Sequence, residues 1–249
     1  MNIQKILVLR FSSLGDIILL TPLFREIKRK YPSARLDFIT STTFQKICSN
    51  NPHIDRIIAF DRKKGTNELF RVAKEIKLCE YDLVFDAHRS LRSRLLLMLG
   101  LGFPSLKRKV LKIDKRSWKR NLLINTKINL LKESVSQREA YCQLLGDIFA
   151  TESFVTDTEL FPEDQEENRV NNILQQFELE GKPIIALGPG SSFQGKTWPK
   201  ERYLELSNTL QEMGFTVVIL GGASDIEPEW IVENSVRKPI NLAGKLSFL

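Results

Sequence analysis

Three short segments of the sequence contain residues whose types and spacing are suited to chemistry. The first is RFSSLGDI (residues 10–17), which follows an apolar run and begins a helical pattern. Such a turn lies at the carboxyl end of a strand, where open α/β sheets bind their ligands. Its Asp16 begins the helix, where the helix dipole favours an ionised carboxylate. Two roles are open for Asp16: a structural carboxylate in the first helical turn, or a general base for an attacking hydroxyl.

The neighbours of Asp16 are suited to ligand contacts. Ser12 and Ser13 can cap the helix or donate hydrogen bonds to a ligand oxygen, and Gly15 allows close approach to the backbone. The segment does not have the G-x-G-x-x-G spacing of dinucleotide-binding turns.

The second segment, GSSFQGKT (residues 190–197), matches the G-x-x-x-x-G-K-[ST] pattern of phosphate-binding P-loops. Trp198-Pro199 follows at once, where a P-loop helix would already be running, and the next apolar run, FTVVIL, ends without an acid to hold Mg²⁺. We therefore interpret the match as a chance one. Glycine, serine and lysine before a helix still favour an anion site. The candidate residues are Gly190, Ser191, Ser192 and Lys196.

The third segment, GGASDIE (residues 221–227), follows the FTVVIL run. A glycine pair followed by acids is suited to ribose hydroxyls, with Asp225 or Glu227 accepting the hydrogen bonds. The same residues are suited to a plain helix cap, with Ser224 or Asp225 as the N-cap. Both interpretations remain open from the sequence.

The elements that position these segments alternate between strands and helices. Apolar β-rich runs predict strands over residues 3–9, 35–40, 55–60, 82–86 and 110–113, and again over 183–187, 215–220 and 239–242. Helical patterns cover residues 16–30, 67–78, 90–99, 118–149, 200–213 and 226–236. This βαβ rhythm predicts an α/β fold with two parallel sheets. An acidic, weakly periodic connection over residues 151–165 separates a domain of residues 1–160 from one of residues 161–249.

Charge is distributed unevenly along the 249 residues. The net charge is +7, yet residues 89–120 contain eleven Lys/Arg and one acid, whereas residues 151–180 contain nine acids and one base. The basic segment indicates either a solvated surface or contact with an anionic partner.

The remaining composition narrows the class of protein. Three scattered cysteines favour a reducing compartment over a disulfide framework. Neither His53 nor His88 has other potential metal ligands near it at the spacing of a metal site. No apolar stretch is long enough to span a membrane, so we expect a cytoplasmic protein without a metal or other cofactor.

Four motifs, in order along the chain, resemble glycosyltransferase family 9, the bacterial ADP-heptose:lipopolysaccharide heptosyltransferases. They are RFSSLGDIILLTP (residues 10–22), DAHRSLRS (86–93), GPGSSFQGKTWP (188–199) and NLAGKLS (241–247). The resemblance implies a GT-B fold, in which two Rossmann-like domains face each other across a cleft. It implies metal-independent, inverting transfer of heptose from ADP-heptose to the lipopolysaccharide inner core or a related surface glycan.

The resemblance also implies roles for individual residues. Asp16 would be the general base, and Lys196 would stabilise the departing diphosphate. The donor would be bound by Gly190, Ser191, Ser192, Lys196, Asp225 and Glu227. The side of the phosphorylated, lipid-linked acceptor would hold Ser12, Ser13, Gly15, His88, Arg89 and Arg92. The basic segment would then face that acceptor or the anionic inner face of the inner membrane, and no nucleic acid is expected.

One departure from the family leads to an expectation about the second domain. The family continues into a D-S-G-x-x-H segment that helps to hold the donor, and this sequence has none. We therefore expect an incomplete second domain. The alternatives to an active transferase are a P-loop-type nucleotide hydrolase or kinase, and an inactive fragment of a heptosyltransferase.

Overall fold

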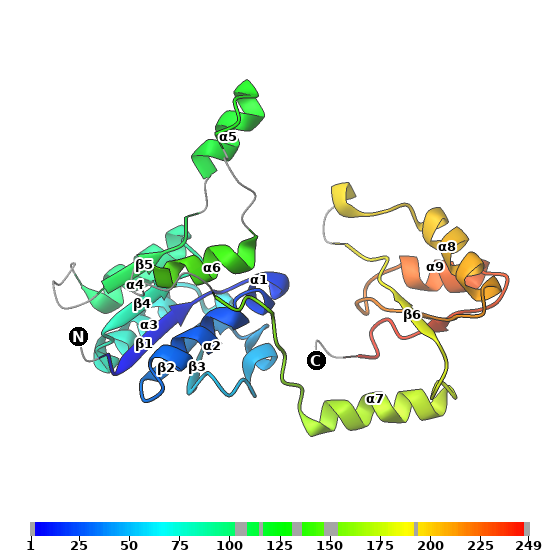
Figure 1. Cartoon of the computed structure of the whole chain (residues 1–249), viewed down its shortest axis with the longest axis horizontal. Helices are drawn as coiled ribbons and strands as arrows, with labels where there is room; N and C mark the ends of the chain where they lie inside the picture. Colours follow the sequence, from blue (N-terminus) through cyan, green and yellow to red (C-terminus); the bar gives the residue numbers. More distant parts are fainter. Residues whose placement is uncertain are drawn as a thin grey trace. The chain divides into compact units, whose positions relative to one another are not determined.

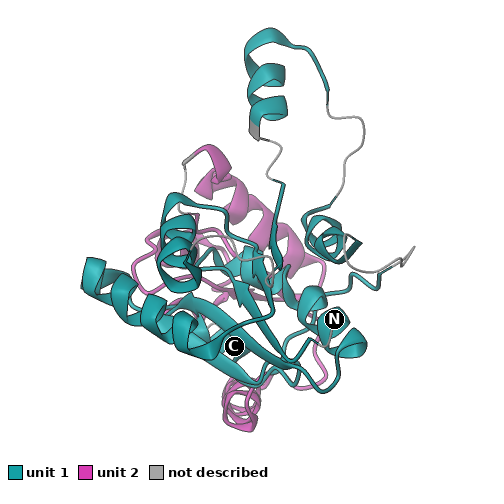
Figure 2. Cartoon of the chain, turned by 90° about the vertical axis from the view of Figure 1, so that its left-hand side faces the viewer, with its two compact units in different colours: residues 1–161 teal, residues 162–249 magenta. Residues whose placement is uncertain are grey.

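The chain forms two compact units. The computed structural model describes residues 3–102, 109–114, 117–130, 136–146, 154–191 and 194–246. Unit 1 covers Met1–Phe161 and unit 2 covers Pro162–Leu249 (Figure 2). The division falls one residue beyond the expected boundary, and the substrates assigned to the two halves stay predictions.

Unit 1 is built on a five-stranded parallel sheet. Its strands are β1 (Lys5–Leu9), β2 (Arg35–Ser41), β3 (Arg56–Phe60), β4 (Leu83–Asp86) and β5 (Lys109–Lys112). They lie in the order β3-β2-β1-β4-β5, and every pair is parallel. This is the doubly wound arrangement that the alternation of strands and helices predicts.

Helices cover both faces of this sheet (Figure 1). The α-helices of unit 1 are α1 (Leu14–Ile18), α2 (Thr21–Lys30), α3 (Gly65–Cys79), α4 (Leu91–Leu101), α5 (Ser117–Thr126) and α6 (Gln137–Gly146). Two short 3-10 helices are η1 (Gln45–Cys48) and η2 (Arg62–Lys64).

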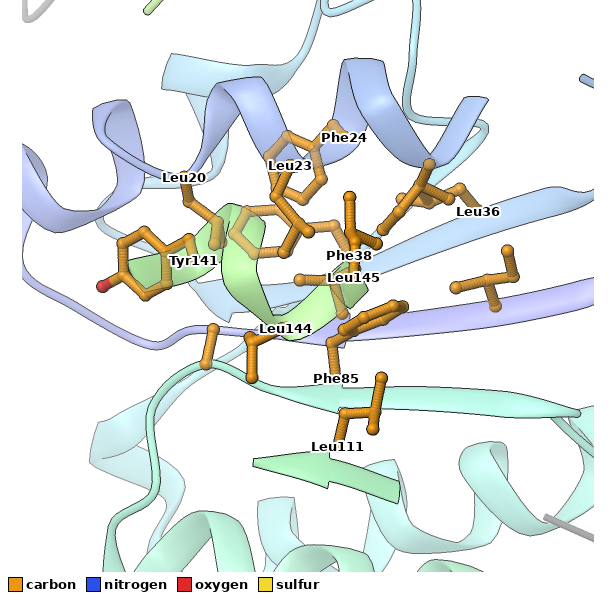
Figure 3. Packing of buried hydrophobic residues seen from close by; sticks show 14 of the residues in the cluster. Leu20, Leu23, Phe24, Leu36, Phe38, Phe85, Leu111, Tyr141, Leu144 and Leu145 are labelled. Atoms are coloured by element: carbon orange, nitrogen blue, oxygen red, sulfur yellow. The ribbon is translucent and has the colours of Figure 1, made fainter. Parts of the chain in front are cut away.

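The alternation of side chains along β1 creates two cores. Ile6 and Val8 belong to the core beneath α1, α2 and α6, whereas Leu7 and Leu9 belong to the core beneath α3 and α4. Figure 3 shows the first of these cores, in which side chains of α2 and α6 meet those of β2, β4 and β5. Because both faces of the central strands are buried, β1 after Lys5 and β4 before Asp86 are continuously apolar, as buried parallel strands usually are.

The helix predicted over residues 16–30 is in fact two helices, α1 and α2. Pro22 has no N–H to donate to the carbonyl of Ile18, so an uninterrupted helix would lose that hydrogen bond. The Thr21 hydroxyl donates to the same carbonyl at 2.9 Å instead. Pro22 then occupies the first turn of α2, where its missing N–H costs nothing.

The helix predicted over residues 118–149 is likewise interrupted. α5 ends at Thr126, and Lys127 has a left-handed φ of 62°. A new helix, α6, begins after Ser136, whose hydroxyl accepts from the N–H of Glu139 while the Glu139 carboxylate accepts from the N–H of Ser136. This reciprocal capping box is a strong local start signal.

Unit 2 contains a three-stranded parallel sheet. Its elements in chain order are α7 (Asp164–Gln176), β6 (Ile184–Leu187), the 3-10 helix η3 (Gln194–Lys196), α8 (Lys200–Glu212), β7 (Thr216–Ile219), α9 (Glu227–Asn234) and β8 (Ile240–Asn241). The strand order is β6-β7-β8, with β7 between the other two. The predicted strands and the last two helices match this unit, whereas α7 was not expected.

Two phenylalanines of unit 1 provide a test of this packing. Phe85 is fully buried in the core of Figure 3, and Phe70 is 60% exposed on α3. We expect Phe85→Ala to lower the free energy of unfolding by roughly 3–5 kcal/mol, since it removes apolar contacts and leaves a cavity. Phe70→Ala should change it by less than about 0.5 kcal/mol. Urea unfolding followed by far-UV circular dichroism measures both, and equal losses would contradict the assigned core.

Candidate functional site

The sheet order of unit 1 creates a topological switch point between β1 and β4. The chain leaves β1 toward β2 on one side, and after β3 it crosses to place β4 on the other side. The loops that follow β1 and β4 therefore lead to opposite sides of the sheet at its carboxyl edge, which is the usual ligand position in this fold. The first and second family-like motifs, RFSSLGDI and DAHRSLRS, are these two loops.

Arg10 joins the two loops. Its Nε donates to the carbonyl of Ser12 at 2.6 Å, and its Nη1 donates to the carbonyl of Ala87 at 2.6 Å. Its Nη2 lies 2.5 Å from Oδ2 of Asp16. The guanidinium also lies 5.8 Å from the ring centroid of Tyr141 on α6. Arg10 is 9% exposed, so these contacts satisfy a charge that is largely removed from water.

Asp16 has a structural role through one of its two oxygens. Oδ2 accepts from the backbone N–H of Ser13 at 3.1 Å and from the Ser13 hydroxyl at 2.8 Å, besides its ion pair with Arg10. Ser13 and Asp16 are the capping box of α1, as the structural interpretation of the sequence expected. Within the described part of the chain no hydrogen bond reaches Oδ1. With the side chain 31% exposed, that oxygen is available to a ligand.

The surroundings of Asp16 keep its carboxylate ionised. Partial burial raises the pKa of Asp16, but the hydrogen bonds from Ser13 and the charge of Arg10 outweigh it and hold the pKa below its ordinary value of 3.8. The carboxylate is therefore able to accept a proton at neutral pH.

Ser12 and Gly15 lie on the same loop and its helix. The Ser12 hydroxyl accepts from Nη2 of Arg62, the first residue of η2, at 2.8 Å. A Cβ built on Gly15 would meet nothing within 4 Å in the described chain. Since the chain itself does not require glycine there, a ligand-facing role for Gly15 stays a prediction.

The loop after β4 is organised by Asp86, a residue that the sequence did not single out. Asp86 is fully buried, and its carboxylate accepts from the backbone N–H groups of His88 and Arg89 at 3.2 and 2.7 Å. It also accepts from the Ser93 hydroxyl at 3.0 Å, and Ser90 and Ser93 cap α4. Asp86 is therefore a structural carboxylate.

The three candidate acceptor-side residues of this loop have different settings. His88 packs edge-on against Phe11 with ring centroids 5.3 Å apart, so it lies beside the RFSSLGDI loop. Arg89 has a φ of 45°, and its Nη1 donates to the carbonyl of Ile113 at 2.9 Å and lies 3.5 Å from Asp114. Arg92 is exposed on the first turn of α4. The structure thus places His88 nearest to Asp16's loop and directs Arg89 toward β5.

In unit 2 the loops after β6, β7 and β8 lie next to one another, with Asp225 in the middle one. Oδ2 of Asp225 accepts from the N–H of Gly222 at 2.7 Å. A Cβ on Gly190 would overlap the same oxygen, so the Asp225 side chain would have to shift to accommodate any other residue there. Gly244, after β8, has a φ of 71°, and a Cβ there would lie 2.8 Å from Cα of Ala223. The second and third candidate segments are therefore neighbours, with Gly190 beside the Asp225 carboxylate.

The helix-cap interpretation of GGASDIE is wrong. The N-cap of α9 is Ile226, whose side chain has no polar group to cap the helix. The carboxylate of Asp225 instead accepts a hydrogen bond from the N–H of Gly222, which precedes it in the chain. Glu227 is half-buried at the first position of α9.

The remaining donor-side candidates lie on the loop before α8. Lys196 ends η3 and is exposed, and Ser191 is also exposed, whereas Ser192 lies outside the described residues. α8 begins only at Lys200, after Pro199 as its N-cap. In a P-loop the helix would already be running at the lysine, so the geometry argues against that interpretation. The Trp198 ring packs edge-on against the Tyr203 ring, with the ring centroids 5.0 Å apart.

Arg10 and Arg62 are the residues that the sequence reasoning missed. Arg10 directly follows β1, and Arg62 lies two residues after the end of β3. A basic residue at the carboxyl end of a parallel strand was the available signal, since that edge is where ligands and loop contacts gather.

Other chemistries find little support among the described residues. No group of three or more His, Cys, Asp or Glu side chains in that part of the chain is arranged to hold a metal ion. All three thiols are free, and burial raises the pKa of Cys48 to about 12 and that of Cys142 to about 11, so neither is a ready nucleophile. No described helix is long and apolar enough to cross a membrane.

Two α/β units, each with its glycine-rich or acidic segments at the carboxyl edge of a parallel sheet, define the class: an α/β protein of the GT-B type. The family model of glycosyltransferase family 9 (heptosyltransferase) matches residues 69–249. The chain therefore belongs to glycosyltransferase family 9, and the resemblance drawn from its motifs is confirmed.

Relatives and solved structures agree with this assignment. Lipopolysaccharide heptosyltransferase 2 of Escherichia coli is 27% identical over 236 residues, which are 90% of this chain and 65% of the relative. The glycosyl transferase family 9 structure from Veillonella parvula matches with a TM-score of 0.82 at 21% identity, covering 99% of this chain and 72% of that one. The structure of E. coli ADP-heptose lps heptosyltransferase II matches with a TM-score of 0.71 at 23% identity, covering 97% and 73%. The chain thus spans about two thirds of the length of these proteins, and the two structures confirm the α/β, GT-B-type fold class.

The ionised state of Asp16 gives a prediction on pH. A carboxylate whose pKa is lowered by folding contributes stability above its ordinary pKa of 3.8, and loses that contribution as the pH falls through its lower folded value. We expect the difference in unfolding free energy between wild type and Asp16→Asn to be constant from neutral pH down to about 4.5 and to shrink below it. Urea unfolding at a series of pH values measures it. A difference that grows on acidification would contradict the environment described for Asp16.

The contact between Gly190 and Asp225 gives a second prediction. Gly190→Ala should destabilise unit 2 by roughly 1–3 kcal/mol, because the new Cβ overlaps Oδ2 of Asp225. In an Asp225→Ala background the same change should cost less, since the overlapping atom is gone. Gly188→Ala is the matched control, because a Cβ there meets nothing within 4 Å. Unfolding followed by tryptophan fluorescence measures all four variants, and additive effects would contradict the contact.

Proposed function

We propose that this chain transfers heptose from ADP-heptose to a hydroxyl of the lipopolysaccharide inner core or a related surface glycan. The observation that supports it best is the divided use of the Asp16 carboxylate: Oδ2 is held by Ser13 and Arg10, and Oδ1 is open at the switch point. Membership of the family and the names of the relatives, which are lipopolysaccharide heptosyltransferases, indicate the sugar and the acceptor.

In the proposed reaction Asp16 is the general base. Its Oδ1 accepts the proton of the acceptor hydroxyl as that oxygen attacks the anomeric carbon of the heptose. The bond from the anomeric carbon to the ADP oxygen breaks, and its electron pair leaves with the diphosphate. Attack from the face opposite the leaving group inverts the anomeric centre. The lowered pKa of Asp16 makes the carboxylate available at neutral pH, although it also limits its basicity.

The loop of unit 2 would stabilise the leaving diphosphate. Lys196 is exposed on it and supplies a positive charge, and Ser191 and Ser192 supply hydrogen-bond donors. These groups would stabilise the negative charge of the diphosphate, for which many transferases use a divalent cation. We therefore propose that transfer is independent of metal and needs no further cofactor. Asp225 already holds Gly222, so Glu227 is the better candidate for a contact with the nucleoside.

The acceptor would bind at the carboxyl edge of unit 1. Ser12, Ser13, Gly15 and His88 lie on the two loops that Arg10 joins, and Arg89 and Arg92 follow on the second loop and on α4. A phosphorylated, lipid-linked glycan is suited to these cations, which favours a cytoplasmic enzyme acting at the inner face of the inner membrane. The placement of Lys196 four residues before α8 gives no support to a P-loop hydrolase or kinase.

A transfer assay in EDTA tests the proposal. The chain is incubated with ADP-heptose and a soluble heptose-accepting core oligosaccharide, and ADP release and product mass are followed. We expect Asp16→Asn to lower kcat by about 10²–10⁴-fold, since it removes the base. We expect Lys196→Ala to lower it by about 10²–10³-fold, since it removes charge stabilisation.

Matched controls separate chemistry from folding. Asp157→Asn and Lys182→Ala change exposed residues of the same types and should leave transfer unchanged. Nuclear magnetic resonance of the product should show the anomeric configuration opposite to that of the donor. Retention of configuration, strict dependence on Mg²⁺, or full activity of Asp16→Asn would contradict the mechanism. Absence of both ADP binding and transfer would favour the inactive fragment.

A further inference from the structure

One helix of unit 1 has no packing role. Figures 1 and 2 both show α5 standing away from the sheet and the other helices of this unit. None of its described side chains from Trp118 to Thr126 is buried, nor are those of residues 127–130 that follow. We call residues 117–130 the α5 arm. An isolated helix of ten residues is marginal in water, so a surface that covers it would stabilise it.

The α5 arm exposes large apolar side chains along its length. Trp118 and Ile124 are each 61% exposed, Ile128 is 53% exposed and Leu130 is 40% exposed. Clusters of exposed apolar side chains usually indicate an interaction surface. Tryptophan in particular is enriched where an apolar phase meets water, because its ring is apolar and its N–H is polar.

The same arm is basic and contains no acid. Lys119, Arg120 and Lys127 alternate with the apolar residues, and no Asp or Glu occurs between Asp114 and Glu133. The Lys119 ammonium lies 5.7 Å from the Trp118 ring centroid. Each cation near an anionic lipid surface contributes about 1 kcal/mol to binding. Basic and apolar side chains together are the combination that binds the interface of an anionic membrane.

We infer that the α5 arm is a docking surface for an anionic phospholipid membrane. The cations would contact the lipid headgroups, and Trp118 with Ile124 would enter the headgroup–acyl boundary. Charge alone would serve a nucleic acid or a soluble phosphate equally well. Trp118 could also stack on a base, but the three aliphatic side chains Ile124, Ile128 and Leu130 would gain little from those partners, whereas a lipid surface buries them. The inference gives the proposed membrane contact a location and does not require the transfer reaction.

A second exposed face of unit 1 provides a matched control. On α3, Phe70 is 60% exposed, and Lys74 and Lys77 are exposed beside it. This face thus has the same side-chain types, but α3 also contains the acids Glu68 and Glu75 and is packed on α4. A membrane contact specific to the α5 arm should not depend on it.

The test is co-sedimentation of the chain with vesicles, without donor or acceptor. Vesicles of phosphatidylglycerol mixed with phosphatidylcholine are compared with vesicles of phosphatidylcholine alone. We expect binding to the anionic vesicles that weakens with salt, and little binding to the neutral ones. The double variants Lys119→Gln/Arg120→Gln and Trp118→Ser/Ile124→Ser should each weaken binding by roughly tenfold or more. The control Phe70→Ser/Lys74→Gln/Lys77→Gln should bind as the wild type does.

Several results would overturn the inference. They are equal binding to neutral vesicles, wild-type binding by either α5 variant, or loss of binding in the α3 control. Binding of the α5 arm to single-stranded RNA without vesicle binding would indicate a nucleic-acid surface instead. A dimer that the Trp118→Ser/Ile124→Ser variant converts to a monomer, again without vesicle binding, would indicate contact between two copies. Because no sugar is present, failure of the transfer assay leaves this test unaffected.

Discussion

The guanidinium of Arg10 is the contact on which the candidate site of unit 1 depends. It lies at the end of the central strand β1, is almost fully buried, and reaches three partners that belong to two loops. A buried cation is tolerated only when its donors are satisfied. Arg10 therefore requires the carbonyls of Ser12 and Ala87 and the carboxylate of Asp16, and its guanidinium in turn holds these groups in place. The two loops of the switch point are thereby fixed to each other.

This arrangement gives Asp16 two functions without conflict. One oxygen completes the start of α1 and neutralises Arg10, and the other remains open to solvent. A carboxylate used only as a cap would need no exposed second oxygen, and a carboxylate used only as a base would be less firmly oriented. Unit 2 contains a comparable contact, in which one oxygen of Asp225 accepts a hydrogen bond from the backbone N–H of Gly222 in a glycine-rich loop. In both units, carboxylates at the strand ends therefore order the loops that contain them.

Much of the fold followed from local patterns in the sequence. The described strands lie where apolar runs predicted them, because a strand that packs in a parallel sheet buries apolar side chains. The errors came from competing local signals. Thr21 and Pro22 divide the first predicted helix, and Lys127 with Ser136 divide the long one, although periodicity continues through both breaks.

The candidate site was less predictable than the fold. The rule that ligands gather at strand ends located the loops, and Asp16 followed from its place in the first of them. Arg10 did not follow, because its partner Ala87 is 77 residues away and becomes a neighbour only when β4 pairs with β1. The role of Asp225 was missed for a related reason: its hydrogen bond runs back to Gly222 instead of forward into α9. The comparisons establish the family, whereas the roles of the single residues stay predictions.

The most direct test of the central claim is the titration of the Asp16 carboxyl group by ¹³C nuclear magnetic resonance, in wild type and in Arg10→Met. The signal would be assigned by its absence in Asp16→Asn. The account predicts that Asp16 titrates below 3.8 in the wild type, and that its pKa rises in Arg10→Met while the fold persists. An Asp16 pKa that is the same in both proteins would contradict it, since Arg10 would then not help the hydrogen bonds from Ser13 to hold the carboxylate ionised.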